Sequence, residues 1–286
     1  MAYLLVASLI WGLSFGLIKI FLAGVDASAV AVARLSLSCL AFLPFLRPGA
    51  LRGGLRWRLT LTGAVQYGLM YVFYLRSFKT LLSYEVALFT ALTPFYVALL
   101  DGWVRRRLCG RVFAASALAV IGTWIAVWQN PLHSRALGGF LLVQASNICF
   151  ALGQIAYRQI LQKEPGLPDH RIFALLYLGG VLASAVMLPG RFGLWPEGLS
   201  LPQTGVLIYL GLVASGLGFF LWNAGARRVG PGTLAILNNF KIPLAAIFAV
   251  LLFGEKAYWA RLTIGLAIVF AALSLVREQR DQTAKS

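Results

Sequence analysis

A lysine in the middle of an apolar stretch is the residue of this sequence that most clearly suggests binding chemistry. Lys241 lies about nine residues into the run 232–252, one helical turn after Asn238, so both side chains share a helix face. An amino group in an apolar interior is costly unless it is paired or hydrated, and we expect Lys241 and Asn238 to bind a substrate carboxylate. In the alternative, Lys241 only braces the helix, because Pro243 frees a backbone carbonyl beside it.

Aromatic and amide side chains recur at helical spacing in two other apolar stretches. Tyr67, Tyr71 and Tyr74 share one helix face, and Phe220 and Asn223 stand at the matching positions of 204–224. Tyrosine offers an apolar ring with a polar tip, which suits an amphipathic solute, so we expect Tyr71, Tyr74, Phe220 and Asn223 to bind substrate. The alternative is helix packing and an interfacial aromatic belt.

Three charged residues form a candidate gate: Lys19 and Glu85 at the ends of apolar runs, and Arg34 about two turns inside one. Lys19, Arg34 and Glu85 are all expected on the same outer side, where two cations and one acid can close a mouth. Alternatively, both cations extend to the interface and Glu85 accepts from nearby backbone. Glu85 is also the candidate for proton coupling.

The composition decides what kind of structure must position these residues. Hydrophobic residues make up 60% of the 286 residues, charged residues 12%, and the mean hydropathy is +0.81. Soluble domains carry roughly 25% charged residues. The sequence therefore predicts an all-α integral membrane protein and excludes a soluble enzyme or a large extramembrane domain.

Hydropathy predicts ten transmembrane helices, which place both termini on one side of the membrane. The first is not expected to be a cleaved signal peptide, because no basic residue precedes it. The apolar stretches are 3–22, 28–46, 59–78, 83–103, 112–128, 139–160, 171–188, 204–224, 232–252 and 260–276.

The basic residues predict the orientation. The net charge is +16, and 16 of the 25 Lys and Arg residues fall on the side of the termini against 6 on the other. Basic loops stay in the cytoplasm, so we expect both termini there. The same rule explains the excess of basic residues without a nucleic-acid partner, and Arg105 to Arg107 are expected to anchor the orientation and contact lipid.

An internal repeat is visible in the sequence. Trp11 to Lys19 align with Phe150 to Arg158 at an offset of 139, and 81–100 align with 230–249, with Pro94 on Pro243. Because each copy has an odd number of helices, the second enters the membrane from the opposite side. The prediction is two inverted five-helix repeats, 1–130 and 131–286.

Several short motifs resemble the EamA family of the drug/metabolite transporter superfamily. They are Trp11-Gly12-x-Ser14-Phe15, Arg34, Trp222-Asn223, Pro243 and Phe253-Gly254-Glu255-Lys256. The sequence departs from the family at Asp101 to Val104 and at Asn238 to Lys241. The resemblance implies a bacterial inner-membrane carrier with a central cavity lined by the first, third, fourth, sixth, eighth and ninth helices.

That implied cavity gives further candidates for substrate binding and for bending of the helices. Trp11, Ser14, Gln154 and Tyr157 are the inward candidates on the first and sixth helices. The repeat maps the face of Lys241 onto Phe89. Pro94 and Pro243 are the expected helix kinks.

The function predicted from these features is secondary transport by alternating access. The substrate is expected to be an amino acid or a related carboxylate; a cationic amine or drug, a non-transporting receptor and a membrane-embedded enzyme are the alternatives. No cofactor or metal site is expected, since the sequence offers no phosphate-binding loop and only scattered Cys and His residues. The partners expected are a small-molecule substrate and membrane lipid, and the oligomeric state stays open.

The charge count predicts how fusion tags report the topology. Tags after Gln129 and Pro189 should be accessible from outside intact cells, and tags after Arg52, Arg107 and Lys285 should not. Labelling of a C-terminal tag from outside would refute the arrangement of ten helices.

Overall fold

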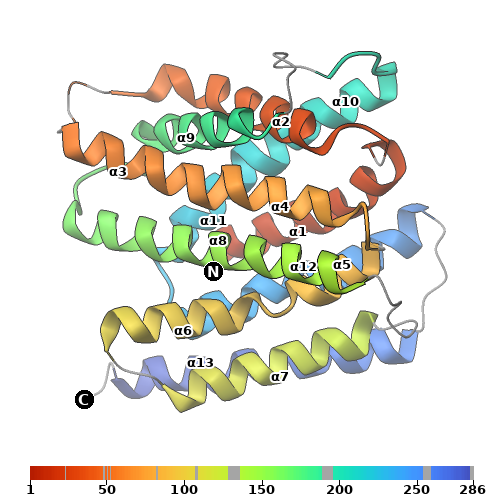
Figure 1. Cartoon of the computed structure of the whole chain (residues 1–286). Helices are drawn as coiled ribbons and strands as arrows, with labels where there is room; N and C mark the ends of the chain where they lie inside the picture. Colours follow the sequence, from red (N-terminus) through yellow and green to blue (C-terminus); the bar gives the residue numbers. More distant parts are fainter. Residues whose placement is uncertain are drawn as a thin grey trace.

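The computed structural model describes residues 1–22, 24–47, 49, 51, 53–81, 83–106, 109–127, 136–188, 196–253 and 259–283, and these residues form helices and turns without a strand. Figure 1 shows the helices side by side, from α2 and α9 at one side of the bundle to α7 and α13 at the other. The α-helices are α1 (Ala2–Leu17), α2 (Ala27–Phe42), α3 (Gly53–Gly63), α4 (Met70–Ser77), α5 (Ser83–Thr90), α6 (Thr93–Arg105), α7 (Gly110–Val127), α8 (Ala136–Lys163), α9 (Phe173–Val186), α10 (Leu201–Tyr209), α11 (Gly218–Ala226), α12 (Pro231–Phe253) and α13 (Trp259–Thr283).

Short π-helical and 3₁₀ segments join or extend several of these helices. Those of π type are η1 (Ile18–Leu22), η4 (Ala64–Leu69) and η6 (Leu210–Leu217); those of 3₁₀ type are η2 (Leu43–Phe45) and η5 (Asp169–Arg171). The segment η4 connects α3 to α4, and η6 connects α10 to α11. Each forms one continuous helical segment with its neighbours.

Five of the helical segments are long and apolar enough to cross a membrane: Ala2–Leu22, Ala27–Phe45, Glu85–Arg105, Leu137–Lys163 and Leu201–Ala226. Shorter apolar helices cover Gly110–Ile125, Phe173–Val186, Gly232–Phe248 and Trp259–Ala272. The expected stretch 59–78 is helical through α3, η4 and α4. Its passage through the membrane, and the total of ten, stay predictions. The boundary expected between 130 and 131, and the Gly254-Glu255-Lys256 part of the family motif, lie outside the described residues.

Polar and apolar side chains are distributed as a bilayer requires. Val186 and Leu201 are 84% and 86% exposed, while Gln66, Asn223 and Asn238 are fully buried. Lipid replaces water as the surrounding solvent, so apolar side chains face outward and polar ones must find partners inside. The described part of the chain is therefore a helical membrane protein.

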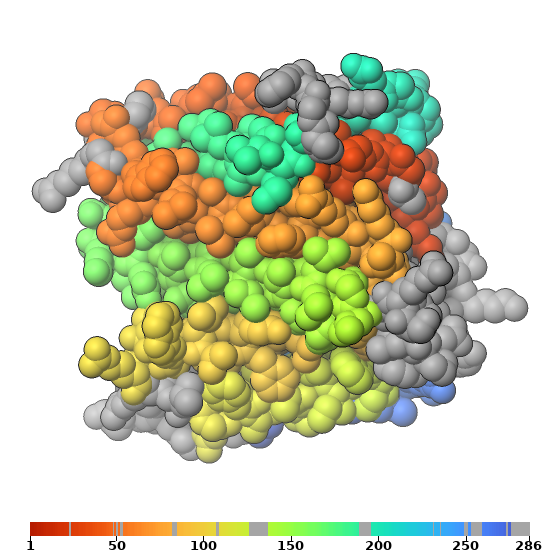
Figure 2. Space-filling view, viewed as in Figure 1, coloured from red at the N-terminus to blue at the C-terminus, as the bar shows by residue number. Residues whose placement is uncertain are grey.

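Helices distant in the sequence interleave in the bundle. Helix α8 lies between α4 and α6, and α9 packs on α2 and α3 (Figure 1). Figure 2 shows, from the same side, that the side chains of these layers fill the spaces between the ribbons. The two halves of the chain therefore share one core.

One helix is interrupted where Pro94 predicts a kink. α5 ends at Thr90, and α6 begins at Thr93 with Pro94 in its first turn. Proline removes one backbone donor, so the carbonyl four residues earlier loses its partner. The Thr93 hydroxyl donates to that Thr90 carbonyl at 2.7 Å. By contrast, α12 continues through Pro243, and a kink there stays a prediction.

Glycine allows α9 to approach α3 closely. A Cβ on Gly179 would lie 1.8 Å from the backbone oxygen of Thr60, and one on Gly63 would lie 1.8 Å from that of Leu176. Backbone atoms cannot swing aside as a flexible side chain can. These two glycines therefore fix the distance between the helices.

We expect Gly179→Ala to destabilise the protein by about 1–3 kcal/mol, because the added methyl group overpacks a backbone contact. Gly205→Ala in α10 is the matched control, since nothing lies within 4 Å of a Cβ built there. Alanine is the better helix former, so the control should keep or slightly raise stability. Thermal unfolding in detergent measures both, and equal shifts would contradict the close contact.

Candidate functional site

A cavity of about 90 Å³ lies among α1, α2, α4, α5, α6, α8, α11 and α12. α5 and α6 together form the fourth expected helix, so the lining comes from the first, third, fourth, sixth, eighth and ninth helices, as the family resemblance implies. Arg34 adds α2, the second expected helix. The lining residues are Trp11, Ser14, Phe15, Ile18, Arg34, Met70, Tyr71, Tyr74, Thr90, Thr93, Ser146, Asn147, Phe150, Phe219 and Lys241.

Lys241 lies in the cavity wall against aromatic rings. Its Nζ is 5.2 Å from the ring centre of Trp11 and 5.6 Å from that of Phe150, and 3.5 Å from Oδ1 of Asn238. Aromatic faces attract a cation and exclude water. Because the only hydrogen bond among these contacts is the long one to Asn238, the ammonium group keeps donors for a ligand. Asn238 itself lies beside Lys241 but outside the lining.

The other cation of the lining, Arg34, is held by hydroxyl groups. Its Nε donates to Oγ of Ser215 at 3.1 Å, and its Nη2 donates to Oη of Tyr71 at 2.6 Å. The guanidinium carbon lies 4.5 Å from the centre of the Tyr71 ring. The side chain is buried, and Nη1 has no hydrogen-bond partner among the described residues.

An aromatic cluster forms the apolar part of the wall. The Trp11 ring contacts Phe150, Phe219 and Trp222 at centroid distances of 6.0, 5.2 and 5.1 Å. Its indole nitrogen donates to the carbonyl of Ala214 at 2.8 Å, so its orientation is fixed. Ser14 donates to the backbone of its own helix. This wall offers a ligand apolar area rather than polar contacts.

Amide side chains close the break between α5 and α6 beside the cavity. Asn147 donates to the Phe89 carbonyl at 3.0 Å and accepts from Thr93, and Asn239 donates to the Ala91 carbonyl at 2.8 Å. The carbonyl groups freed by the break are thus bound to protein donors. The break consequently does not form an open cation site.

Of the residues expected to bind substrate, five lie in the lining: Trp11, Ser14, Tyr71, Tyr74 and Lys241. The expected gate residue Arg34 lies there too. The other expected binding residues are outside the lining: Asn238, Asn223, Phe220, Gln154, Tyr157 and Phe89.

Those outer residues have contacts of other kinds. Asn223 exchanges hydrogen bonds with Gln66 at 2.9 and 3.2 Å. Phe220 packs on the rings of Phe42 and Phe173, and Phe89 packs on that of Phe140.

The expected residues of α8 and the remaining gate candidates also lie away from the cavity. Tyr157 donates to Asp169, and Gln154 is buried. Glu85 is fully buried, whereas Lys19 is exposed.

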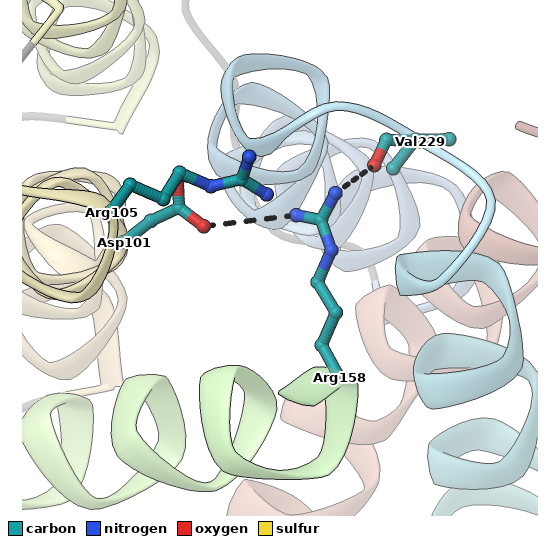
Figure 3. A network of polar contacts seen from close by, with 4 residues as sticks. All are labelled: Asp101, Arg105, Arg158 and Val229. Carbon is teal, nitrogen blue, oxygen red and sulfur yellow. Dashed lines mark hydrogen bonds and ion pairs between the residues drawn. The ribbon is translucent and has the colours of Figure 1, made fainter. Parts of the chain in front are cut away.

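A second polar cluster lies at the ends of α6 and α8 (Figure 3). Arg158 reaches from α8 to the Val229 carbonyl at 3.1 Å and to Asp101 of α6 at 3.9 Å. Asp101 also pairs with Arg105 at 2.8 Å. The cluster links α6 of the first half to two segments of the second half.

The sequence contains signals for some site residues that were not among those expected. Phe150 aligns with Trp11 in the repeat, and the two rings meet in the cavity wall. Arg158 aligns with Lys19, a gate candidate, and Asp101 stands where the first copy departs from the family. Nothing in the sequence signals the pairing of Ser215 with Arg34.

Comparison with known proteins identifies relatives over nearly the whole chain. Residues 1–128 and 137–277 match the EamA-like transporter family. A biotin transporter of Salmonella typhimurium is 36% identical over 97% of this chain and 93% of its own length, and a probable biotin transporter of Pseudomonas aeruginosa is 38% identical over 99% of both chains. A probable amino-acid metabolite efflux pump of Salmonella typhimurium is 25% identical over 94% of this chain and 91% of its own length.

A known crystal structure shares the fold. It superimposes with a TM-score of 0.75 over 96% of this chain and 95% of its own, at 18% sequence identity.

Proposed function

The chain belongs to the EamA-like transporter family, and from this premise we propose that it carries biotin, or a carboxylate of similar size and shape, across the membrane. Family membership makes it a multi-pass membrane transporter of small metabolites, and its relatives are named as transporters rather than enzymes. The narrower proposal, that the substrate is biotin, is supported by the names of the relatives and by the chemistry of the cavity.

The observation that carries this proposal is a buried cation between aromatic walls. Biotin has a carboxylate on an apolar chain that ends in a fused ring system with a cyclic urea. Lys241 suits the carboxylate, and the rings of Trp11, Phe150 and Phe219 suit the apolar body. Pairing with the carboxylate would compensate for the burial of the lysine.

The charge of the lining argues against the other substrates considered. The lining contains Arg34 and Lys241 but no Asp or Glu. A cationic amine would meet two like charges, and an amino acid would bring an ammonium group without an acidic partner. A carboxylate without an amino group fits this lining better. Because one relative is named as a probable amino-acid metabolite efflux pump, export of an amino acid is the second candidate function.

We further propose ten membrane-crossing helices in two inverted repeats, 1–130 and 131–286. The π-helical segments η4 and η6 overlap when the sequence is shifted by the repeat offset of 149, and the equivalent residues Trp11 and Phe150 meet at the cavity. Both observations support a site between two related halves. The protein is then a bacterial inner-membrane carrier with both termini in the cytoplasm.

Alternating access requires a closure at each end of the cavity. On the side predicted to be cytoplasmic, Arg158, Asp101 and Arg105 tie the two halves together (Figure 3). Their proposed role is to close that end, and they must separate when it opens. Lys19 and Glu85 remain the proposed counterparts on the outer side, whereas Arg34, the third gate candidate, lies in the cavity lining.

The first test of this function is the charge of Lys241. We expect Lys241→Met to weaken biotin binding by about a hundred-fold to several thousand-fold, because losing one partner of a buried ion pair costs about 3–5 kcal/mol. Binding of the uncharged biotin amide should change little. Binding to purified protein measures both ligands, with Lys163→Met at the exposed end of α8 as control. An equal loss for acid and amide would leave Lys241 a purely structural role.

The second test concerns the proposed cytoplasmic closure. Asp101→Asn should favour opening at that end, because it removes the acid that pairs with Arg158 and Arg105. A cysteine replacing Ser146 in the cavity lining should then react about 2- to 5-fold faster with an impermeant thiol reagent in inside-out vesicles, which corresponds to about 0.4–1 kcal/mol. The starting protein for this test has its three native cysteines replaced, so that the reagent reacts only with the introduced one.

Asp26→Asn is the matched control for this closure. Asp26 caps α2 and takes no part in the cluster. Unchanged labelling in Asp101→Asn, or the same increase in both variants, would contradict the closure.

A further inference from the structure

We propose that Arg34 binds the uncharged end of the substrate, donating a hydrogen bond from Nη1 to a single acceptor oxygen such as the ring carbonyl of a cyclic urea. The site then distinguishes substrates at both ends, with Lys241 at the carboxylate and Arg34 at the ring. This inference rests on the proposed transport of biotin or a similar carboxylate and assigns a specificity role to one residue.

The hydrogen bonds of Arg34 restrict what it can bind. Ser215 accepts from Nε and Tyr71 accepts from one N–H of Nη2, so two of the five guanidinium N–H donors are engaged. A carboxylate binds arginine best through two parallel hydrogen bonds from two nitrogens. The two hydroxyls take one such pair, Nε and Nη2, and the unpartnered Nη1 still offers donors to an acceptor oxygen such as a ring carbonyl.

The unmet donor of Arg34 is itself an argument for a ligand. Nη1 is buried and has no hydrogen-bond partner among the described residues, although Arg34 belongs to the cavity lining. Buried donors are nearly always paired, and an unpaired donor on a charged group is especially costly. A ligand oxygen would supply the missing partner.

Lys241 occupies a different part of the lining. It contacts Trp11, Phe150 and Asn238, on α1, α8 and α12, whereas the partners of Arg34 come from α4 and η6. The two cations share none of these neighbours. A ligand with one negative charge can neutralise only one of them, so the other must bind a neutral group.

The division between the two cations follows from their donors. Lys241 has three donors and one long hydrogen bond, of 3.5 Å to Asn238, and can still bind both oxygens of a carboxylate. Arg34 is fixed in orientation by two hydroxyls and by the Tyr71 ring. In this division Arg34, fixed in orientation, binds the ring carbonyl, and Lys241, which is more weakly held, binds the carboxylate.

Three ligands test this division: biotin, its amide, and the analogue in which sulfur replaces the ring carbonyl oxygen and accepts hydrogen bonds poorly. Wild-type protein should prefer biotin to the sulfur analogue by about 10- to 100-fold, or about 1.4–2.8 kcal/mol. Arg34→Gln should reduce the preference for biotin over the sulfur analogue to within about 3-fold and keep the preference for biotin over its amide. Lys241→Met should do the reverse.

Arg76→Gln is the matched control. Arg76 donates to the carbonyl of Met187 at 3.3 Å and lies outside the cavity lining. Both binding ratios should stay as in the wild type.

If Arg34→Gln does not fold, two milder variants replace it. Tyr71→Phe and Ser215→Ala remove the hydroxyls that orient the guanidinium. Each should lower the ratio of the affinities for biotin and the sulfur analogue and leave the ratio of the affinities for biotin and its amide unchanged. An unchanged first ratio in both would overturn the inference.

Two other outcomes overturn it as well. A loss in Arg34→Gln of the preference for biotin over its amide would show that Arg34 holds the carboxylate. An equal loss for all three ligands would leave Arg34 a structural residue. Folded wild-type protein that binds none of the three ligands would instead refute the proposed function.

Discussion

The cost of keeping positive charge inside an apolar bundle shapes the centre of this protein. Lys241 and Arg34 both line the cavity, where no carboxylate is present among the lining residues. Each is accommodated differently: the lysine lies against aromatic faces, and the arginine is bound by two hydroxyls. The carboxylate of the proposed substrate would supply further compensation.

The same apolar surroundings demand partners for the backbone. Where the chain breaks between α5 and α6, the carbonyls of residues 89 to 91 accept hydrogen bonds from Asn147, Thr93 and Asn239. These side chains come partly from the other half of the chain, so the break is also a point of attachment between the halves. It places polar groups beside the cavity without adding negative charge to the lining.

Close backbone contacts and longer side-chain contacts occupy different places in the bundle. Gly63 and Gly179 bring α3 and α9 into close backbone contact. The link between Asp101 and Arg158, by contrast, consists of side chains at helix ends and spans 3.9 Å. This distribution fits the proposed alternating access, in which packed helical units would move and separate at such ends.

The sequence by itself determined the helical membrane class and the membership of a transporter family, because hydropathy and short motifs are local properties. It also put Tyr67, Tyr71 and Tyr74 on one helix face, since that depends only on helical periodicity. Only the tertiary structure decided what each one meets. Tyr71 and Tyr74 line the cavity, while Tyr67 accepts a hydrogen bond from Asn223. Periodicity does not reveal which neighbouring helix a face will contact, or at what height. Arg34 and Ser215 are 181 residues apart, and their hydrogen bond exists because two helices pack at one particular position.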